Sequence, residues 1–312
     1  MEGLFLMDYE KNAIEILRMI GSNNGFTVAD SGGKDSSVLT HIAMKAGCPF
    51  DVVHNHTTVD APETVYFIRE KFKKLRAAGI KAEVIMPRET MWQLIVRKKT
   101  PPTRLIRYCC SELKESYGAG KKMVTGVRKA EGVNRAKNQG VVTFPKPHKN
   151  VREMVDDENF HLTGKGGVVI LNLDNDEKRQ LVEHCYRTQK VLINPLIDWD
   201  DEFLWWYIKH EGIEINPLYG CGWERVGCIG CPMAGKHRAW EFERYPAYKR
   251  AYIKAFEKML IAREQAGLEN KCGWTDAESV FRWWMEDKTD PNQMTIDDWL
   301  HEIGADYTLT GD

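Results

Sequence analysis

Short apolar runs alternate with helix-like patterns through the first half of this 312-residue chain. The runs at residues 26–29, 50–54 and 82–86 have the length of buried strands, while residues 35–46 and 62–75 carry apolar side chains at helical spacing. Strand–helix–strand alternation produces a parallel sheet with helices on both faces. We therefore predict an α/β fold with a doubly wound, mostly parallel sheet.

The first of these strands leads into the loop SGGKDSS, residues 31–37, which is followed directly by a helical pattern. The two glycines let backbone N–H groups turn inward around an anion, and the helix N-terminus adds a partial positive charge. Lys34 supplies a full positive charge, and the serine hydroxyls can donate further hydrogen bonds. The alternative is a glycine turn with a capping Ser or Asp. The strand–loop–helix context favours a phosphate site.

This loop resembles the PP-loop of the ATP pyrophosphatases, and the chain resembles the phosphoadenosine-phosphosulfate (PAPS) reductase family within that superfamily. Four further segments carry the resemblance: DAPET at 60–64, RYCCSELK at 107–114, GVRKAE at 126–131 and NPLIDW at 194–199. The resemblance implies an adenine nucleotide alpha hydrolase-like fold, ATP with Mg²⁺ as cofactor, and cleavage between the α and β phosphates.

The resemblance also implies roles for single residues. Lys34, Asp35 and Arg128 would be catalytic, with Arg128 near phosphate or sulfate. Arg128 also follows a predicted strand at the carboxyl edge of the sheet, where ligands of open α/β sheets bind; the alternative is a surface arginine. Asp60 would lie near the nucleotide, or would cap the following helix. The predicted nucleotide-binding residues are Ser31, Gly32, Gly33, Lys34, Asp35, Ser36, Ser37, Asp60, Gly126 and Arg128.

Five of the eight cysteines are candidate metal ligands. Two cysteines separated by two residues bind a metal readily, and a proline often follows the last cysteine of an iron–sulfur run. With the pair in CIGCP favoured first, the candidates are Cys228, Cys231, Cys221, Cys109 and Cys110. The resemblance implies a 4Fe–4S cluster, as in adenylylsulfate reductases and related DNA phosphorothioation enzymes. Zinc on the same ligands and buried free thiols are alternatives. The other three, Cys48, Cys185 and Cys272, are predicted to be structural; the alternative for Cys272 is the catalytic cysteine that sulfonucleotide reductases of the resembled family carry in a C-terminal tail.

Charge is unevenly distributed, although the formal net charge is only −1. Residues 97–149 contain fourteen Lys and Arg against three Glu, which favours a polyanionic partner: nucleotide phosphates or a nucleic-acid acceptor. The alternative is a solvated face balanced by acids elsewhere. No run reaches about 18 apolar residues, and the N-terminus does not resemble a secretory signal. We therefore expect a cytoplasmic protein with no membrane partner and without disulfide bonds.

Three regions are predicted along the chain. Residues 1–210 form a PP-loop nucleotide-binding domain in which residues 136–166 are an excursion or lid. Residues 211–265 form a cysteine-rich, cluster-binding segment with one helix over residues 239–263. Residues 266–312 form a helical C-terminal tail.

These features predict an enzyme that cleaves ATP to AMP and pyrophosphate and adenylates an acceptor for sulfur transfer. Nucleic-acid thiolation is a candidate reaction, with a cysteine desulfurase as candidate sulfur donor. The first alternative is a sulfonucleotide reductase that forms sulfite from adenylylsulfate or PAPS. Dedicated reductases of the resembled family have degenerate loops, whereas Lys34 and both glycines are intact here. The second alternative is a non-catalytic nucleotide-binding subunit.

Overall fold

The computed structural model describes residues 2–115, 117–145, 160–163, 167–171, 190–270 and 273–286. The chain divides into two compact units. Unit 1 comprises Met1–Asn55, Pro62–Ile85 and Tyr117–Val226, and unit 2 comprises His56–Ala61, Met86–Ser116 and Gly227–Asp312. This division differs from the three consecutive regions expected from the sequence, because two early segments group with the C-terminal part of the chain.

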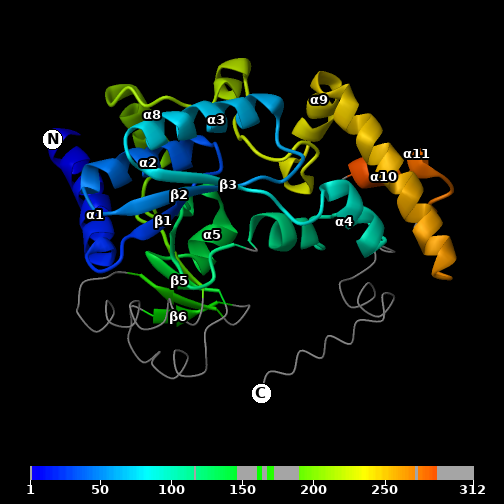
Figure 1. Cartoon of the computed structure of the whole chain (residues 1–312), viewed down its shortest axis with the longest axis horizontal. Coiled ribbons are helices and arrows are strands. Elements are labelled where there is room, and N and C mark those ends of the chain that lie inside the picture. The colour runs from blue at the N-terminus through cyan, green and yellow to red at the C-terminus, as the bar shows by residue number, and fades with distance from the viewer. Residues whose placement is uncertain are drawn as a thin grey trace. The chain divides into compact units, whose positions relative to one another are not determined.

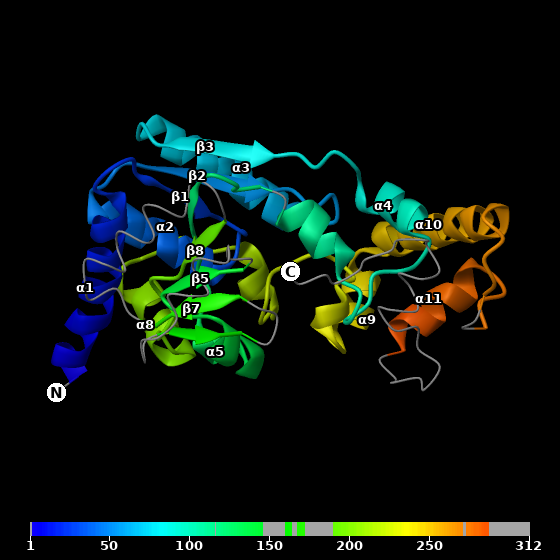
Figure 2. The ribbon, with the colours of Figure 1, turned by 90° about the horizontal axis from the view of Figure 1, so that it is seen from below.

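Unit 1 is built on one eight-stranded sheet with the order β3-β2-β1-β4-β8-β5-β7-β6. The strands are β1 (Phe26–Ala29), β2 (Phe50–Asn55), β3 (Lys81–Ile85), β4 (Lys122–Val124), β5 (Val142–Phe144), β6 (Phe160–Leu162), β7 (Val168–Ile170) and β8 (Val191–Ile193). The strands from β3 to β8 in this order pair in parallel, and β5, β7 and β6 are added antiparallel. Figure 2 labels β3, β2, β1, β8, β5 and β7 of this succession. The expected α/β class and mostly parallel sheet are confirmed.

The described helices of unit 1 are α1 (Glu2–Gly21), α2 (Lys34–Ala46), α3 (Pro62–Ala77), α5 (Val133–Asn138) and α8 (Asp201–His210). Helix α2 packs against α1, α8 and β1, and α3 packs against β3. The core between them is apolar and fully buried at Val28, Leu39 and Phe72. The phosphate loop thus lies between a buried strand and a helix that is packed on several sides.

Unit 2 is helical, with α4 (Met91–Lys98), α9 (His237–Arg244), α10 (Pro246–Gln265) and α11 (Ala277–Met285). Figure 1 shows α10 as its longest element, and α4, α9 and α11 all pack against it. The core is aromatic: Trp284 contacts Tyr252 and Phe256 at ring-centroid distances of 4.6 and 5.3 Å. Among the described helices of the whole chain, none is both long enough and apolar enough to cross a membrane.

Two details differ from the sequence-based expectations. The single helix expected over residues 239–263 is two helices, because Pro246 begins α10 and Tyr245 before it adopts φ −121° and ψ 66°. Proline disfavours helical geometry in the residue that precedes it, so the first helix ends there. Part of the excursion expected at 136–166 belongs to the sheet, as β5 and β6. The short helix expected near residues 296–301 lies outside the described residues.

Candidate functional site

Asp30, the residue that follows β1, organises the phosphate loop. Its buried carboxylate accepts hydrogen bonds from Gly32 N (2.8 Å) and Ser36 Oγ (2.9 Å). Lys71 on α3 forms an ion pair with the same carboxylate. Burial would raise the pKa of Asp30, but the charge of Lys71 and these hydrogen bonds hold the pKa below its ordinary value. An ionised Asp30 therefore ties the loop to the start of α2. This residue was not among those predicted from the sequence.

Gly32 occupies a position that demands glycine. Its φ is +76°, and a Cβ there would lie 2.9 Å from Thr64 Cγ2 on α3. Any other side chain would be strained and would overlap α3. The next residue, Gly33, is the N-cap of α2 and offers no side chain to cap it. The loop therefore carries backbone donors at a helix N-terminus, the arrangement that binds anions.

Two side chains distant in sequence contact this loop. Asn216 Nδ2 donates to Gly32 O (3.2 Å), and Tyr219 Oη accepts a hydrogen bond from the backbone N of Lys34 (2.9 Å). Burial raises the pKa of Tyr219 to about 12, so its hydroxyl is protonated at neutral pH. The Tyr219 ring meets Trp205 edge-on at 5.5 Å, and Lys34 Nζ lies 5.9 Å from the Trp205 ring centroid. The only sequence signal was the Asn-Pro pair at 216–217, which marks a turn.

Four charged side chains form a network at the start of α2. Arg128 donates from Nε to Asp35 Oδ1 (2.5 Å) and from Nη2 to Asp201 Oδ1 (2.7 Å). Lys34 Nζ lies 3.3 Å from Asp35 Oδ2 and 3.7 Å from Asp201 Oδ1. Burial works against ionisation of Asp201, but Arg128 and Lys34 lower its pKa. The network holds Lys34 beside the loop.

Arg128 itself is an anchor inside unit 1. It has no exposed surface, and its third guanidinium nitrogen, Nη1, donates to Trp199 O (3.0 Å). Gly126, just after β4, lets this segment approach α2, since a Cβ there would lie 2.9 Å from the carbonyl carbon of Asp35. The surface-arginine alternative is therefore excluded. The structure places Arg128 on two carboxylates, and Asp201 is a member of the network that the sequence motifs did not reveal.

Four of the five candidate ligand cysteines lie together in unit 2. The pKa of Cys109 is raised by a hydrogen bond to Cys110 and by burial. The charges of Cys110, Cys228 and Cys231 raise it further. The same hydrogen bond lowers the pKa of Cys110, against the effect of burial, and Arg107 Nη2 donates to Cys110 Sγ (3.3 Å). All four side chains are half-buried free thiols. Thiols are ligands of both zinc and iron–sulfur centres, but the group of described residues whose ligand atoms lie within 4.8 Å of one another contains no cysteine.

The turn at residues 228–231 is fixed from both sides. Gly230 N donates to the buried carboxylate of Glu241 (2.7 Å), and Tyr252 Oη donates to Ile229 O (2.9 Å). Gly230 has φ +74°, and a Cβ there would lie 2.5 Å from the Phe242 ring. These contacts set the direction of the two cysteines that flank the turn.

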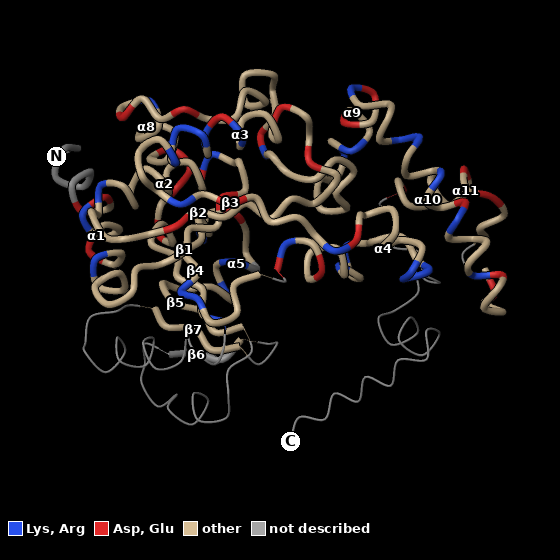
Figure 3. Tube along the Cα trace, viewed as in Figure 1, with Lys and Arg blue, Asp and Glu red and all other residues tan. Residues whose placement is uncertain are grey.

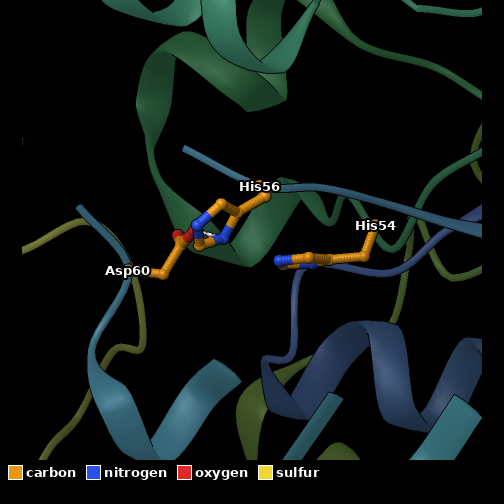
Figure 4. A group of neighbouring side chains, drawn as sticks. All are labelled: His54, His56 and Asp60. Atoms are coloured by element: carbon orange, nitrogen blue, oxygen red, sulfur yellow. Dashed lines mark ion pairs between the residues drawn. The ribbon is translucent and has the colours of Figure 1, made fainter. Parts of the chain in front are cut away.

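Asp60 lies in the same unit as this turn. Its backbone forms a β-bridge with Cys228, and its carboxylate accepts from Thr57 N (2.7 Å) and Thr57 Oγ1 (2.8 Å). Figure 4 shows His56 paired with Asp60, at 3.0 Å between Nδ1 and Oδ2. The pKa of Lys114 is raised, mainly by the charge of Cys228. Burial would lower this pKa, but the charges of Asp60 and Cys110 add to that of Cys228 and outweigh burial. The acidic loop expected near the nucleotide is therefore bonded to the cysteine turn.

Residues 26–234 match the phosphoadenosine phosphosulfate reductase domain family. The chain belongs to this family. The matched range covers the phosphate loop, the Arg128 network and all five candidate ligand cysteines. The resemblance inferred from the motifs is confirmed.

Several relatives of this PAPS reductase family member are curated proteins. An uncharacterised protein of Methanocaldococcus jannaschii is 26% identical over 290 residues, covering 88% of this chain and 50% of that protein. Sulfate adenylyltransferase subunit 2 of Methylorubrum extorquens is 27% identical over 199 residues, 60% of this chain and 56% of the relative. Adenosine 5′-phosphosulfate reductase of Allochromatium vinosum is 40% identical over 42 residues, 14% of this chain and 16% of that enzyme. The chain spans about half the length of the first two relatives it matches.

The fifth candidate ligand differs from the others in this family member. Cys221 lies in unit 1 with an exposed side chain, although it is only seven positions before Cys228. Cys48 is half-buried beside the unit 1 core, as expected of a structural residue. Cys185 and Cys272 lie outside the described residues.

Many cations of the basic stretch at 97–149 have partners within the protein. Arg97 and Lys98 pair with Glu112, Lys121 with Asp51, Lys129 with Asp198 and Arg135 with Glu131. The Lys122 ammonium is buried and donates to Ile20 O, and Arg104 donates to Pro232 O. Most of the described cations that suggested a polyanionic partner therefore have protein partners.

Proposed function

We propose that this protein binds ATP at residues 31–37, cleaves it between the α and β phosphates, and transfers the adenylyl group to an acceptor with release of pyrophosphate. The observation that carries the proposal is the complete loop. Asp30 holds it, Gly32 adopts a left-handed conformation that favours glycine, and the N-cap of α2, Gly33, has no side chain, while Tyr219 accepts the Lys34 N–H. Such a loop suits the β and γ phosphates, which a sulfonucleotide lacks.

Each member of the network has a role in this reaction. Lys34 supplies a positive charge for the phosphates. Arg128 is a positioning residue that holds Asp35 and Asp201. Asp201 is 60% exposed, so its carboxylate can also take part in binding Mg²⁺, which favours carboxylate and phosphate oxygens. The relative named sulfate adenylyltransferase subunit 2 supports adenylyl transfer as the type of reaction.

We also propose that Cys109, Cys110, Cys228 and Cys231 hold a 4Fe–4S cluster, with zinc as the alternative. Four thiols meet the requirement of either centre. When bound, a cluster would supply redox chemistry or a site for sulfur at the acceptor. Arg107 and Lys114 place positive charge next to Cys110, and with its hydrogen bond to Cys109 they lower the pKa of Cys110, which favours the thiolate form needed for binding. A cysteine desulfurase or another sulfur-donor protein is the partner that sulfur transfer would require.

Reduction of a sulfonucleotide is the second candidate function. The specific observation in its favour is the grouping of the tandem Cys109-Cys110 with the later pair, together with the short match to an adenosine 5′-phosphosulfate reductase. A subunit that binds nucleotide without chemistry is the third. The intact phosphate loop favours ATP cleavage over the reductase.

The deciding experiment follows ATP labelled separately at the α and γ positions, with candidate acceptors and with adenylylsulfate supplied in parallel. Labelled AMP or adenylylated acceptor, with pyrophosphate, is expected from the wild-type chain. Lys34→Ala should lose this activity and bind ATP about 10- to 100-fold more weakly, because a charge-assisted contact is lost. Lys73→Ala, an exposed lysine on α3, is the matched control and should change neither.

Two results would replace the proposal. Sulfite formed from adenylylsulfate or PAPS with a thiol reductant, without ATP turnover, would establish the reductase. ATP binding without any product across all acceptors would favour the accessory subunit.

A further inference from the structure

Helix α10 carries a ridge of exposed cations. Arg250, Lys254 and Lys258 follow one another at four-residue intervals, about 6 Å apart along the axis. None of them forms an ion pair with an acid in the part of unit 2 that the structure describes. Figure 3 shows Lys and Arg recurring along α10. These cations contrast with the stretch at 97–149, whose charges are mostly satisfied internally.

An apolar groove runs beside this ridge, between α4 and α10. It has a volume of about 500 Å³. Its floor is apolar and its rim is basic; the lining residues are Trp92, Val96, Ala251 and Ala255, then Gln93, Arg97, Lys254 and Lys258. Arg97 is already paired with Glu89 and Glu112. The charge that the rim can offer a ligand therefore comes from Lys254 and Lys258.

The acidic residues of α10 do not offset this charge on the groove side. Glu257 and Glu264 are exposed, but their helical spacing places them on the flank of the ridge opposite to Ala251 and Ala255. The side of the ridge that faces the groove therefore carries basic residues of α10 and none of its acidic residues. A ligand in the groove would encounter positive charge without a neighbouring carboxylate of α10.

Trp92 is the one large side chain in the floor. Its ring is half-buried and held edge-on to Tyr252, with centroids 4.8 Å apart and planes at 85°. Tyr252 is itself fixed by its hydrogen bond to Ile229 O. Trp92 is therefore a rigid aromatic surface next to a row of cations, the combination that proteins use to bind single-stranded nucleic acid.

We propose that the groove between α4 and α10 binds single-stranded nucleic acid. The ridge contacts successive backbone phosphates, and an unpaired base stacks on Trp92. A duplex fits less well because its bases are not available for stacking. An acidic amphipathic peptide fits less well because it needs a row of apolar anchoring pockets, and apart from Trp92 the floor offers only one valine and two alanines. This binding does not require ATP, so it stands or falls separately from the adenylyl-transfer proposal.

The test measures fluorescence anisotropy of labelled oligothymidylate and oligouridylate of about twelve nucleotides, and of a duplex of equal length, with the full chain. The single strands should bind more tightly than the duplex, with affinity falling as salt increases. Lys254→Glu with Lys258→Glu should weaken single-strand binding at least tenfold and reduce the salt slope by about 1.4, from two lost phosphate contacts. Trp92→Leu should weaken it about tenfold and remove part of the ligand-induced tryptophan quenching.

The matched control is Arg69→Glu with Lys73→Glu, two exposed cations at the same spacing on α3. It makes the same charge change and should leave binding within twofold of the wild type. Unchanged circular dichroism spectra and thermal unfolding curves in all three variants check that they are folded. Equal losses in the groove and control variants would overturn the proposal, as would tighter binding of the duplex. Binding of an acidic amphipathic peptide, with no binding of single strands, would assign the groove to a protein partner instead.

Discussion

The guanidinium of Arg128, which has no exposed surface, donates to the carboxylate of Asp35 at the first turn of α2. The same guanidinium binds Asp201 at the first turn of α8. One buried cation thus joins the starts of two helices beside the phosphate loop. Through these two ion pairs Arg128 contributes to the stability of the fold. That contribution can be measured separately from any direct contact between Arg128 and phosphate.

Arg128→Ala should lower the free energy of unfolding by about 3–5 kcal/mol, because two carboxylates lose a buried partner. Arg128→Lys should recover only part of this, since an ammonium cannot reproduce the fork of the guanidinium. Arg135→Ala removes an exposed pair with Glu131 and should cost under about 1 kcal/mol. Urea denaturation of the three variants measures the differences. Similar losses for Arg128→Ala and Arg135→Ala would show that burial of Arg128 is not decisive.

Gly32→Ala should destabilise the chain by about 2–3 kcal/mol, combining left-handed strain with overlap onto Thr64. Gly47, the C-cap of α2, has a similar φ of +71°, but a Cβ added there would meet nothing within 4 Å. Gly47→Ala should therefore cost only about 1 kcal/mol, from strain alone. Thermal unfolding and ATP calorimetry distinguish them: only Gly32→Ala should also weaken nucleotide binding. An equal effect of both changes on ATP affinity would contradict the role of the loop.

Asp30 makes stability depend on acid pH. Its folded-state pKa lies below the ordinary 3.8, so the unfolded chain takes up the proton more readily. The contribution of Asp30 is therefore complete above about pH 4 and is lost as the pH falls through the folded-state pKa. Asp30→Asn should be about 3 kcal/mol less stable at neutral pH, because Lys71 loses its partner, and should show a shallower loss below about pH 4.

Urea denaturation at several pH values between about 3 and 7 tests this expectation. Asp198→Asn, which removes only an exposed pair with Lys129, is the control and should follow the wild-type curve. Parallel curves for Asp30→Asn and wild type would show that Asp30 does not titrate as the structure indicates.

Cys228→Ser and Cys231→Ser should lose bound metal and stability when the protein is purified without oxygen, because metal binding and local folding are coupled. Cys221→Ser should retain the metal, since its side chain is exposed whereas the other four thiols are half-buried. Metal analysis and absorption spectra give the answer: about four irons and a brown colour indicate the cluster. A colourless protein with one zinc would replace the cluster with a structural zinc site. Loss of metal in Cys221→Ser would restore that residue to the ligand set.

The sequence was informative where structure is local. Alternating strands and helices predicted the sheet, and the glycines with Lys34 predicted the loop, because both depend on neighbouring residues. Tyr219 could not be found this way, since it meets Lys34 across 185 positions of sequence. Arg128 illustrates another limit. The sequence identifies the arginine but not its partner, because a guanidinium binds a phosphate and a carboxylate in the same way.

The cysteines show a related limit. Cys221 stands close to the CIGC turn in sequence, which makes it an attractive ligand, and its place in the ligand set stays a prediction; the structure adds that its side chain is exposed. The tandem pair at 109–110 is more than a hundred positions away and shares the turn's electrostatic environment. Residue spacing alone does not reveal such a grouping of distant residues.

The interleaving of the two units has a consequence for biosynthesis. Unit 1 is complete once residue 226 has been made, so the phosphate loop and its supporting contacts can form while the rest of the chain is still on the ribosome. In the proposed metal site, the tandem thiols of residues 109 and 110 are synthesised early but would have to wait for Cys228 and Cys231. During that interval they are exposed to oxidation and to adventitious metal. Expression under low oxygen, with metal supplied during translation rather than afterwards, should therefore give the higher yield of loaded protein.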